Sequence, residues 1–238
     1  MSTLLLRLAA PLQAWGSNAK FERRGTERAP TKSGVIGMLA AALGRRREEP
    51  VDDLLHLHFG VRVDQEGVLL RDYHTARRDK LAYVTHRYYL SDAIFLVGLE
   101  GDDTWLAQLD YALRHPVFPL FLGRRSCPPA GQVSLGIRQD RSLLEALEGE
   151  PIISSSLTSR SAVNHRLVRL FYDANDTDTG TYYMRDLPMS FDSSHRRYGF
   201  RRVAEASLTL SSVQHQHEVE KATAEPVTAH DPFNEWED

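Results

Sequence analysis

Apolar runs alternate with polar breaks along the first half of the chain, in an order that predicts a mixed α and β fold. The run at 3–10 (TLLLRLAA) predicts a buried first strand, and the run at 92–100 (DAIFLVGLE), whose interior carries no charge, predicts another. Residues 30–44 (PTKSGVIGMLAAALG) predict a helix, because proline and threonine begin it, glycine ends it and apolar residues recur at helical spacing. Residues 102–116 predict a second, amphipathic helix that is capped by aspartate and stopped by proline.

The order strand, helix, strand, insertion, strand, helix fits the split β-α-β pattern of a ferredoxin-like α+β fold. Residues 60–75 (GVRVDQEGVLLRDYHT) predict a hairpin that turns at DQEG. The next segment, 76–91, is basic and aromatic and has no sustained apolar face, so its burial would strand charges away from water. We therefore predict that 76–91 is a basic arm, inserted before the third core strand, that protrudes from the domain.

The same pattern divides the chain into three parts. Residues 1–147 are expected to form the ferredoxin-like domain with its inserted arm. The stretch at 148–162 is typical of a linker, and the alternating segments after it predict a small antiparallel β unit over 148–212. Residues 213–238 lack periodicity and are predicted to be a disordered acidic tail.

The composition narrows the class of protein. The 238 residues, 42% of them hydrophobic, are enough for one elaborated domain or two small ones. No run approaches the roughly 18 apolar residues of a membrane span, and the N-terminus lacks the basic start and long apolar middle of a signal peptide. One cysteine cannot form an internal disulfide, so we expect a protein of the reducing cytoplasm with no membrane partner.

The net charge of −3 conceals an uneven distribution. Residues 1–47 carry nine Lys and Arg against two Glu, a local net of +7, whereas the chain from Glu218 onward carries seven acidic residues and one lysine, a net of −6. Without that tail the body has a net charge of +3, which favours an anionic partner. Arginine outnumbers lysine 25 to 4, and this bias has two interpretations: a GC-rich genome, or phosphate recognition by planar guanidinium groups.

The loop at 118–129 (FPLFLGRRSCPP) places Arg124 and Arg125 beside the only cysteine of the chain. Three interpretations compete: a redox or nucleophilic site at Cys127, a phosphate-binding loop, and an ordinary turn with solvated charges. A nucleophilic cysteine needs a base such as histidine, and none is near in sequence. A packed, inert thiol is therefore the favoured interpretation of Cys127.

Metal and nucleotide motifs are weak. The pairs His56 with His58 and His215 with His217 lack a third ligand at suitable spacing, and TKSG lacks the leading glycine and spacing of a Walker loop. We expect neither a metal nor a cofactor.

Two other segments favour an anionic ligand, and the second of them favours single-stranded RNA. The helix that starts at PTKSG offers free backbone amides and Lys32 to an anion, and its glycines Gly34 and Gly37 cost about 1 kcal/mol each relative to alanine. Close packing explains Gly37, whereas packing and ligand approach explain Gly34 equally well. The stretch at 71–80 (RDYHTARRDK) interleaves basic and aromatic residues, as charge neutralisation and base stacking require. Its tyrosine, histidine and lysine also leave open metal-free RNA cleavage by general acid–base chemistry.

Four segments in register, LRLAAPLQAWG, APTKSGVIGMLAAALG, LLRDYHT and PLFLGRRSCP, closely resemble the CasD family of the type I-E CRISPR surveillance complex, Cascade. The resemblance implies a RAMP-type ferredoxin-like domain that holds the 5′ handle of the guide crRNA and caps the effector complex for antiviral DNA targeting. It also implies that the arm packs against a CasC-type backbone subunit, and that the protein contacts a CasA-type large subunit. In that family a separate subunit cuts the precursor RNA, so no enzymatic role is expected.

A glycine loop of RAMP-type proteins lies against RNA, which implies that the loop beginning at Gly123 clamps a phosphate. The predicted RNA-binding residues are Gln13, Trp15, Arg23, Arg24, Arg28, Thr31, Lys32, Ser33, Arg71, His74, Arg77, Arg78, Arg87, Gly123, Arg124, Arg125 and Ser126. Two alternatives stay open. One is a metal-independent endoribonuclease that processes CRISPR repeat RNA, although Tyr73, His74 and Lys80 match no catalytic motif of such relatives. The other is an RNA-recognition module outside any CRISPR complex.

Overall fold

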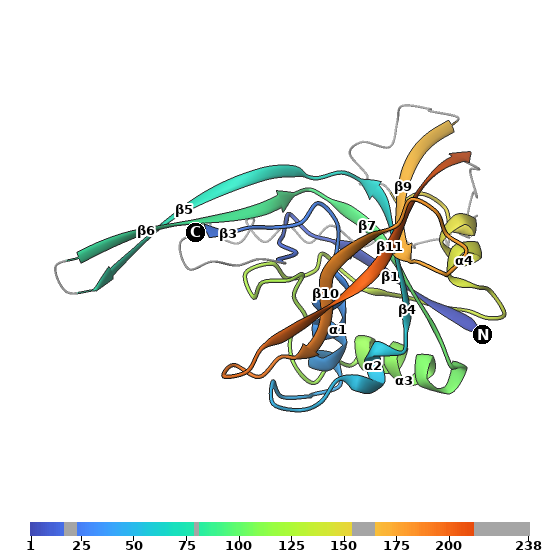
Figure 1. The fold of residues 1–238 in the computed structure, drawn as a ribbon, viewed down its shortest axis with the longest axis horizontal. Helices are drawn as coiled ribbons and strands as arrows, with labels where there is room; N and C mark the ends of the chain where they lie inside the picture. Colours follow the sequence, from blue (N-terminus) through green and yellow to red (C-terminus); the bar gives the residue numbers. More distant parts are fainter. Residues whose placement is uncertain (17–22, 79–80, 154–164, 212–238) are drawn as a thin grey trace, which may run out of the picture.

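The main body of the protein, in this computed structural model, is one seven-stranded antiparallel sheet with helices on both faces (Figure 1). The structure describes residues 1–16, 23–78, 81–153 and 165–211. The sheet has the order β10-β11-β9-β4-β7-β1-β8. Its strands are β1 (Ser2–Ala9), β4 (His58–Gln65), β7 (Ile94–Gly101), β8 (Ser134–Arg138), β9 (His165–Asp173), β10 (Tyr182–Ser190) and β11 (Arg197–Ser211). The helices are α1 (Lys32–Ala42), α2 (Asp52–Leu55), α3 (Asp103–Arg114) and α4 (Leu143–Gly149).

Alternation along β1 builds a core on each face of the sheet. Leu4, Leu6 and Leu8 pack into the large cluster that contains the buried side chains of α1 and α3. Leu5, on the opposite face, packs with buried residues of α4. Because successive side chains of a strand point to opposite faces, this single strand contributes to both layers.

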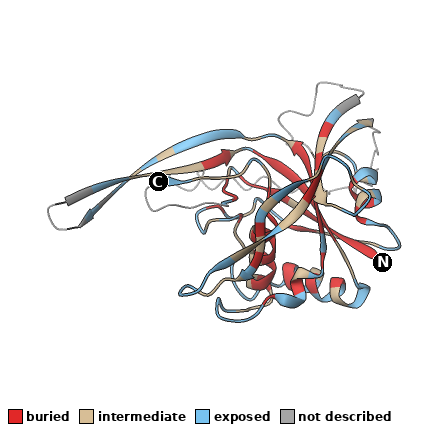
Figure 2. Cartoon of the chain, in the orientation of Figure 1, coloured by how far each residue is buried: buried red, intermediate tan, exposed pale blue. Residues whose placement is uncertain are grey.

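A second, smaller sheet projects from the body. It consists of β2 (Leu12–Gln13), β3 (Arg23–Arg24), β5 (Val68–Arg78) and β6 (Leu81–Ser91), with β6 at its centre. The β5–β6 hairpin extends far beyond the main sheet (Figure 1). Among the hairpin residues whose burial is described, Figure 2 shows buried ones only where the hairpin joins the body. Tyr89 and Leu90, inside the predicted arm, are 4% and 1% exposed and belong to the core.

The predicted hairpin over 60–75 is wrong. β4 pairs with β7 and β9, whereas β5 pairs with β6, so the chain changes sheets at DQEG instead of folding back on itself. Gly67 permits this crossing, since a Cβ there would lie 2.8 Å from both the Cβ of Ala93 and the carbonyl oxygen of Ser91. The protruding hairpin is accordingly longer than the predicted segment 76–91.

The predicted strand at 3–10 and the helices at 30–44 and 102–116 are present as β1, α1 and α3, and the run at 92–100 is β7. Thr31 caps α1 by accepting a hydrogen bond from the Gly34 amide at 3.2 Å, and Asp102 caps α3. Neither β8 nor α4 was expected from the sequence pattern.

The C-terminal strands were expected to form a unit of their own over 148–212. They are antiparallel, but β9 pairs with β4 and so extends the main sheet. The start of the predicted linker is also fixed: the fully buried Arg62 donates to the carbonyl oxygens of Glu150 and Pro151, at 2.6 and 2.9 Å. The Ile153 amide donates to Asp64 at 2.8 Å. The rest of that linker and the predicted acidic tail lie outside the described residues.

Within the described ranges, no helix is long and apolar enough to cross a membrane.

Candidate nucleic-acid interface

Strand register sorts the side chains of the hairpin onto two faces. On one face Arg71 is paired with Tyr88, and Tyr73 with His86, the Tyr73 and His86 rings lying 5.8 Å apart between centroids. β3 runs parallel to β6 and adds Arg23, whose guanidinium lies 5.5 Å from the centre of the Tyr88 ring and donates to its hydroxyl at 3.1 Å. This face is therefore basic and aromatic.

The opposite face of the hairpin carries Asp72, His74 and Arg87, and Arg24 of β3 lies beside Arg87 in register. His74 is held by Asp72, with 2.5 Å between its Nε2 and the carboxylate. The Nε of Arg87 is shielded from water and has no acceptor in the described part of the chain. Arg71 and Arg77 are exposed, as are Arg24 on β3 and Arg28 after it; the side chain of Arg78 and all of Lys80 lie outside what the structure describes.

The loop after α3 forms a tight turn against the second sheet. The Leu122 amide donates to the Cys127 carbonyl at 2.7 Å, and the Cys127 amide donates to the Arg124 carbonyl at 2.8 Å. Gly123 has a φ of +84°, and a Cβ on it would lie 1.7 Å from the Ala14 carbonyl oxygen. The protein's own backbone therefore requires glycine at this position.

Arg124 and Arg125 have different environments. Arg124 is half-buried: its guanidinium lies 4.6 Å from the centre of the Tyr89 ring and donates to the carbonyl oxygens of Arg24 and Gly25, at 2.9 and 3.2 Å. It braces β3 against the base of the hairpin, with Nη1 left without an acceptor among the described residues. Arg125 and Ser126 are exposed.

Cys127 is 1% exposed, and burial raises the pKa of its thiol. A raised pKa lowers the thiolate fraction, so the environment disfavours a nucleophilic or redox role. The interpretation of Cys127 as a packed thiol agrees with this geometry.

The predicted anion site at the start of α1 is filled from within. The Lys32 amide donates to the Asp186 carboxylate at 2.8 Å, and Asp186 also pairs with Arg201 at 2.7 Å. The Lys32 ammonium is buried and bonded to Asp173 and to the Leu57 carbonyl, each at 2.8 Å. An internal carboxylate therefore occupies the positive end of the helix.

Four further predicted contacts are buried structural groups. Gln13 is fully buried and donates to the carbonyls of Leu8 and Ala93, while its Oε1 accepts from the indole of Trp15 at 3.1 Å. Trp15 is 1% exposed, so it offers no ring face to a base. Thr31 and Ser33 are buried at the N-terminus of α1. The structure thus corrects the RNA-binding prediction for the buried side chains of Gln13, Trp15, Thr31, Ser33 and Lys32.

A groove of about 500 Å³ lies over the outer face of α1. Three segments form it: α1 with the arginine run after it, the loop after α3, and the connection from β10 to β11. Its lining is rich in arginine and aromatic residues, namely Arg45, Arg46, Arg47, Phe118, Phe121, Arg125, Phe191, Arg196 and Tyr198. Of these, only Arg125 was predicted, although the run RRR at 45–47 directly after a predicted helix was a visible signal.

Most of the groove's arginines have no side-chain partner within the part of the chain that the structure describes. Arg45 pairs with Asp53 through two bonds of 2.6 and 2.5 Å, and this pairing lowers the pKa of Asp53. The side chains of Arg46, Arg47, Arg125 and Arg196 have no hydrogen bond or ion pair with any described residue.

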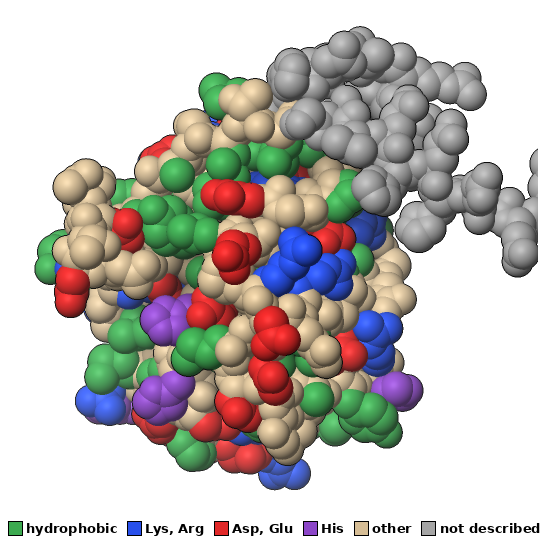
Figure 3. Space-filling model, turned by 90° about the vertical axis from the view of Figure 1, so that its right-hand side faces the viewer, with side chains coloured by type: hydrophobic (Ala, Val, Ile, Leu, Met, Phe, Trp, Pro, Cys, Tyr) green, Lys and Arg blue, Asp and Glu red, His purple; other side chains and the backbone are tan. Residues whose placement is uncertain are grey.

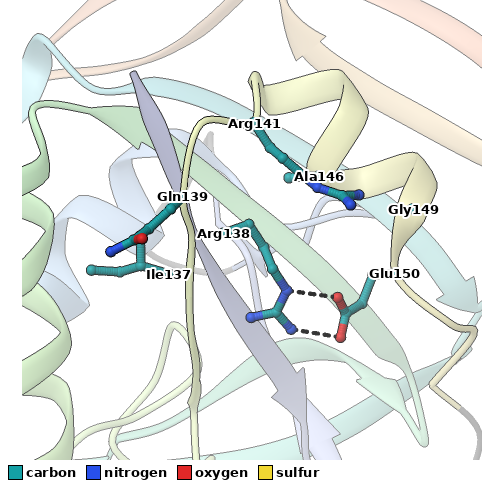
Figure 4. Close-up of a pocket in the computed structure, with 7 residues that line it drawn as sticks. All are labelled: Ile137, Arg138, Gln139, Arg141, Ala146, Gly149 and Glu150. Carbon is teal, nitrogen blue, oxygen red and sulfur yellow. Dashed lines mark hydrogen bonds and ion pairs between the residues drawn. The ribbon is translucent and has the colours of Figure 1, made fainter.

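Other surfaces are less suited to an anion. A hollow of about 420 Å³ beside α4 contains Arg138 and Arg141, but Glu150 neutralises Arg138 through bonds of 3.0 and 2.8 Å (Figure 4). The end of the molecule opposite the hairpin tip carries acidic side chains interspersed with basic ones (Figure 3). Among the described residues no group of three or more His, Cys, Asp or Glu could hold a metal; His215 and His217 lie outside them.

The chain is similar to known CRISPR proteins over most of its length. Residues 3–204 match the family model described as "CRISPR-associated protein (Cas_Cas5)". The "CRISPR system Cascade subunit CasD" of Escherichia coli (strain K12) is 36% identical over 197 residues, which cover 70% of this chain and 85% of that protein. A chain of a solved "CRISPR RNA-guided surveillance complex" superposes with a TM-score of 0.76 at 35% identity, over 88% of this chain and 91% of its own. A structure described as "Crystal structure of Cas protein" gives a TM-score of 0.67 at 41% identity, over 87% and 94%.

Proposed function

Because the chain belongs to the CRISPR-associated Cas5 family, we propose that it binds the 5′ handle of the guide crRNA and caps a Cascade-type effector complex without cutting RNA. Its sequence identity of 36% to the E. coli subunit CasD supports the role of a Cascade subunit. The main support for the RNA-binding site comes from the contacts of Arg124, which bonds the backbone of Arg24 and lies against Tyr89. These contacts form a brace. That brace joins β3, the base of the hairpin and the loop after α3, and so gathers Arg24, Arg87 and Arg125 around it.

The strand order supports a ferredoxin-like core. β1-α1-β4 and β7-α3-β8 are two β-α-β halves, and their strands interleave in the order β4-β7-β1-β8. This is the split arrangement expected of that fold, with the hairpin inserted between the halves.

The hairpin is the proposed contact with neighbouring subunits, a CasC-type backbone subunit first and a CasA-type large subunit second. Its exposed apolar side chains support this assignment: Val68, Leu69, Leu70, Tyr73, Tyr83 and Val84 are each at least 40% exposed. Apolar side chains gathered on an exposed element are typical of a protein interface.

The hairpin geometry favours a non-catalytic role over the endoribonuclease alternative. Tyr73 and His74 are adjacent in β5, so their side chains point to opposite faces and do not converge on one phosphate. His74 is moreover paired with Asp72.

The test is binding of a fluorescein-labelled handle RNA, taken from the repeat of the protein's own locus, by anisotropy over a range of salt concentrations. The slope of log affinity against log salt should become shallower by about 0.7 for each phosphate that the protein no longer neutralises. We expect Arg24→Ala with Arg87→Ala to make the slope shallower by at least about 0.7, the value for one phosphate. Arg141→Ala, an exposed arginine beside α4, is the matched control and should leave the slope unchanged.

Equal slopes for the double variant and the control would refute this RNA-binding surface. The same RNA should stay intact on a gel after incubation in EDTA. Specific cutting that Tyr73→Phe or His74→Ala abolishes would instead establish the endoribonuclease.

A further inference from the structure

We propose that the groove over α1 receives one nucleotide of the bound RNA, with its base against the aromatic side chains and its phosphate held by the arginines. This inference rests on the proposed RNA binding, and it assigns to that RNA a second contact that adjoins the first at Arg125.

The two glycines of α1 differ in the room that a side chain would have. A Cβ on Gly34 would lie 2.8 Å from the Cε3 of Trp15, so close packing explains that glycine. A Cβ on Gly37 would meet only the Phe191 ring, at 3.5 Å, which is an ordinary contact. Glycine is costly inside a helix, and packing does not require it at position 37. Position 37 therefore accepts a methyl group, whereas a larger side chain there would project into the groove that Gly37 lines.

The walls of the groove suit a planar ring. Phe191 stands over Gly37, and Phe118, Phe121 and Tyr198 line the same space. Aromatic side chains stack on any base, since every base has a π-face. A volume of about 500 Å³ lies within the range of about 300–1,000 Å³ typical of small-ligand sites, so the groove suits one nucleotide.

The charge of the groove specifies an anion. Arg46, Arg47, Arg125 and Arg196 lack partners among the described residues, and Glu48 is the single acidic residue of the lining. Guanidinium groups bind phosphate oxygens through paired hydrogen bonds. Aromatic rings, together with arginines that have no partner among the described residues, fit a nucleotide better than an acidic peptide, whose acidic side chains have no ring to stack.

The groove is continuous with the proposed RNA surface through Arg125. That residue lines the groove, and its neighbour Arg124 lies against Tyr89 at the base of the hairpin. A strand of RNA that crosses β3 and the hairpin base therefore reaches the groove along one loop.

The test uses the full chain and the handle RNA. Gly37→Leu fills the groove from a helix position that favours leucine over glycine, and Gly37→Ala is its matched control. We expect Gly37→Leu to weaken affinity about tenfold, the effect of removing one stacked base, and Gly37→Ala to leave it within about twofold. Arg196→Ala, which does not touch the helix, should also weaken binding and keeps the test valid if Gly37→Leu fails to fold.

A second readout locates the base directly. RNA that carries 4-thiouridine should crosslink on irradiation to Phe121, Phe191 or Tyr198, as mapped by mass spectrometry of the digested protein. Wild-type affinity in both Gly37→Leu and Arg196→Ala, with no such crosslink, would refute the groove while leaving the RNA surface intact. A groove that binds an acidic peptide without any competition from RNA would also refute it. A wild-type chain that binds no RNA at all overturns the RNA-binding proposal itself.

Discussion

Alanine at Gly34 and at Gly37 should have opposite effects on stability. Both glycines lie in α1, so each substitution recovers up to about 1 kcal/mol of helix propensity. The gain is smaller at Gly34, which lies in the first turn directly after the N-cap.

At Gly34 the new methyl group has no room. It would lie 2.8 and 3.0 Å from two carbons of the Trp15 ring and 3.1 Å from the Thr31 hydroxyl. The indole cannot retreat, because it is 1% exposed and its N–H is bonded to Gln13. Overpacking of this kind costs about 1–3 kcal/mol. Gly34→Ala should therefore be destabilised, by up to about 3 kcal/mol.

At Gly37 the methyl group meets Phe191 at 3.5 Å and displaces nothing. Gly37→Ala should be neutral or stabilised by up to about 1 kcal/mol. The two variants should then differ by about 1–3 kcal/mol in the free energy of unfolding, measured by urea denaturation with far-UV circular dichroism. Equal stabilities, or a destabilised Gly37→Ala, would refute the assignment of Gly34 to packing and of Gly37 to the groove.

Two other predictions concern buried groups. Arg62→Met leaves the fully buried Asp64 carboxylate without its cation and should lower the free energy of unfolding, measured in urea, by about 3–5 kcal/mol. Adding Asp64→Leu should recover a large part of that loss. A loss below about 1 kcal/mol in the single variant would contradict a stabilising buried pair. Because burial raises the pKa of Cys127, its thiolate fraction at mildly alkaline pH lies below that of an exposed cysteine. A disulfide reagent should therefore label it slowly in the native chain and fully after unfolding, and fast native labelling would show an accessible, reactive thiol.

Local signals were enough to predict the elements whose ends are determined locally. Thr31 and Asp102 cap α1 and α3 through atoms two or three residues away, and the sequence shows these residues directly. Strand pairing is different, because an alternating segment does not identify its partner. β4 and β5 follow one another closely, yet β4 continues the main sheet with β7 and β9 while β5 joins β6. The hairpin expected at DQEG failed for this reason.

The same limit applies to the site. Free amides and a lysine at the start of α1 correctly indicate an anion, but that anion is Asp186, which lies 154 positions further along the chain. Asp173 and Arg201 complete the cluster from β9 and β11. No spacing within PTKSG distinguishes an internal carboxylate from a phosphate, so the local motif predicts the charge of the partner without its identity.

The neighbouring arginines Arg124 and Arg125 show how burial separates two residues that are equivalent in sequence. Arg124 lies on Tyr89 and bonds two backbone carbonyls, those of Arg24 in β3 and of the residue after it, so its removal loosens the segment that presents Arg24. Arg125 is exposed and lines the groove, so its removal takes away a proposed phosphate ligand at a stability cost below about 0.5 kcal/mol. Changing both at once would combine a loss of structure with a loss of binding. Only single substitutions, with RNA affinity compared per folded molecule, separate the structural role of Arg124 from the phosphate contact proposed for Arg125.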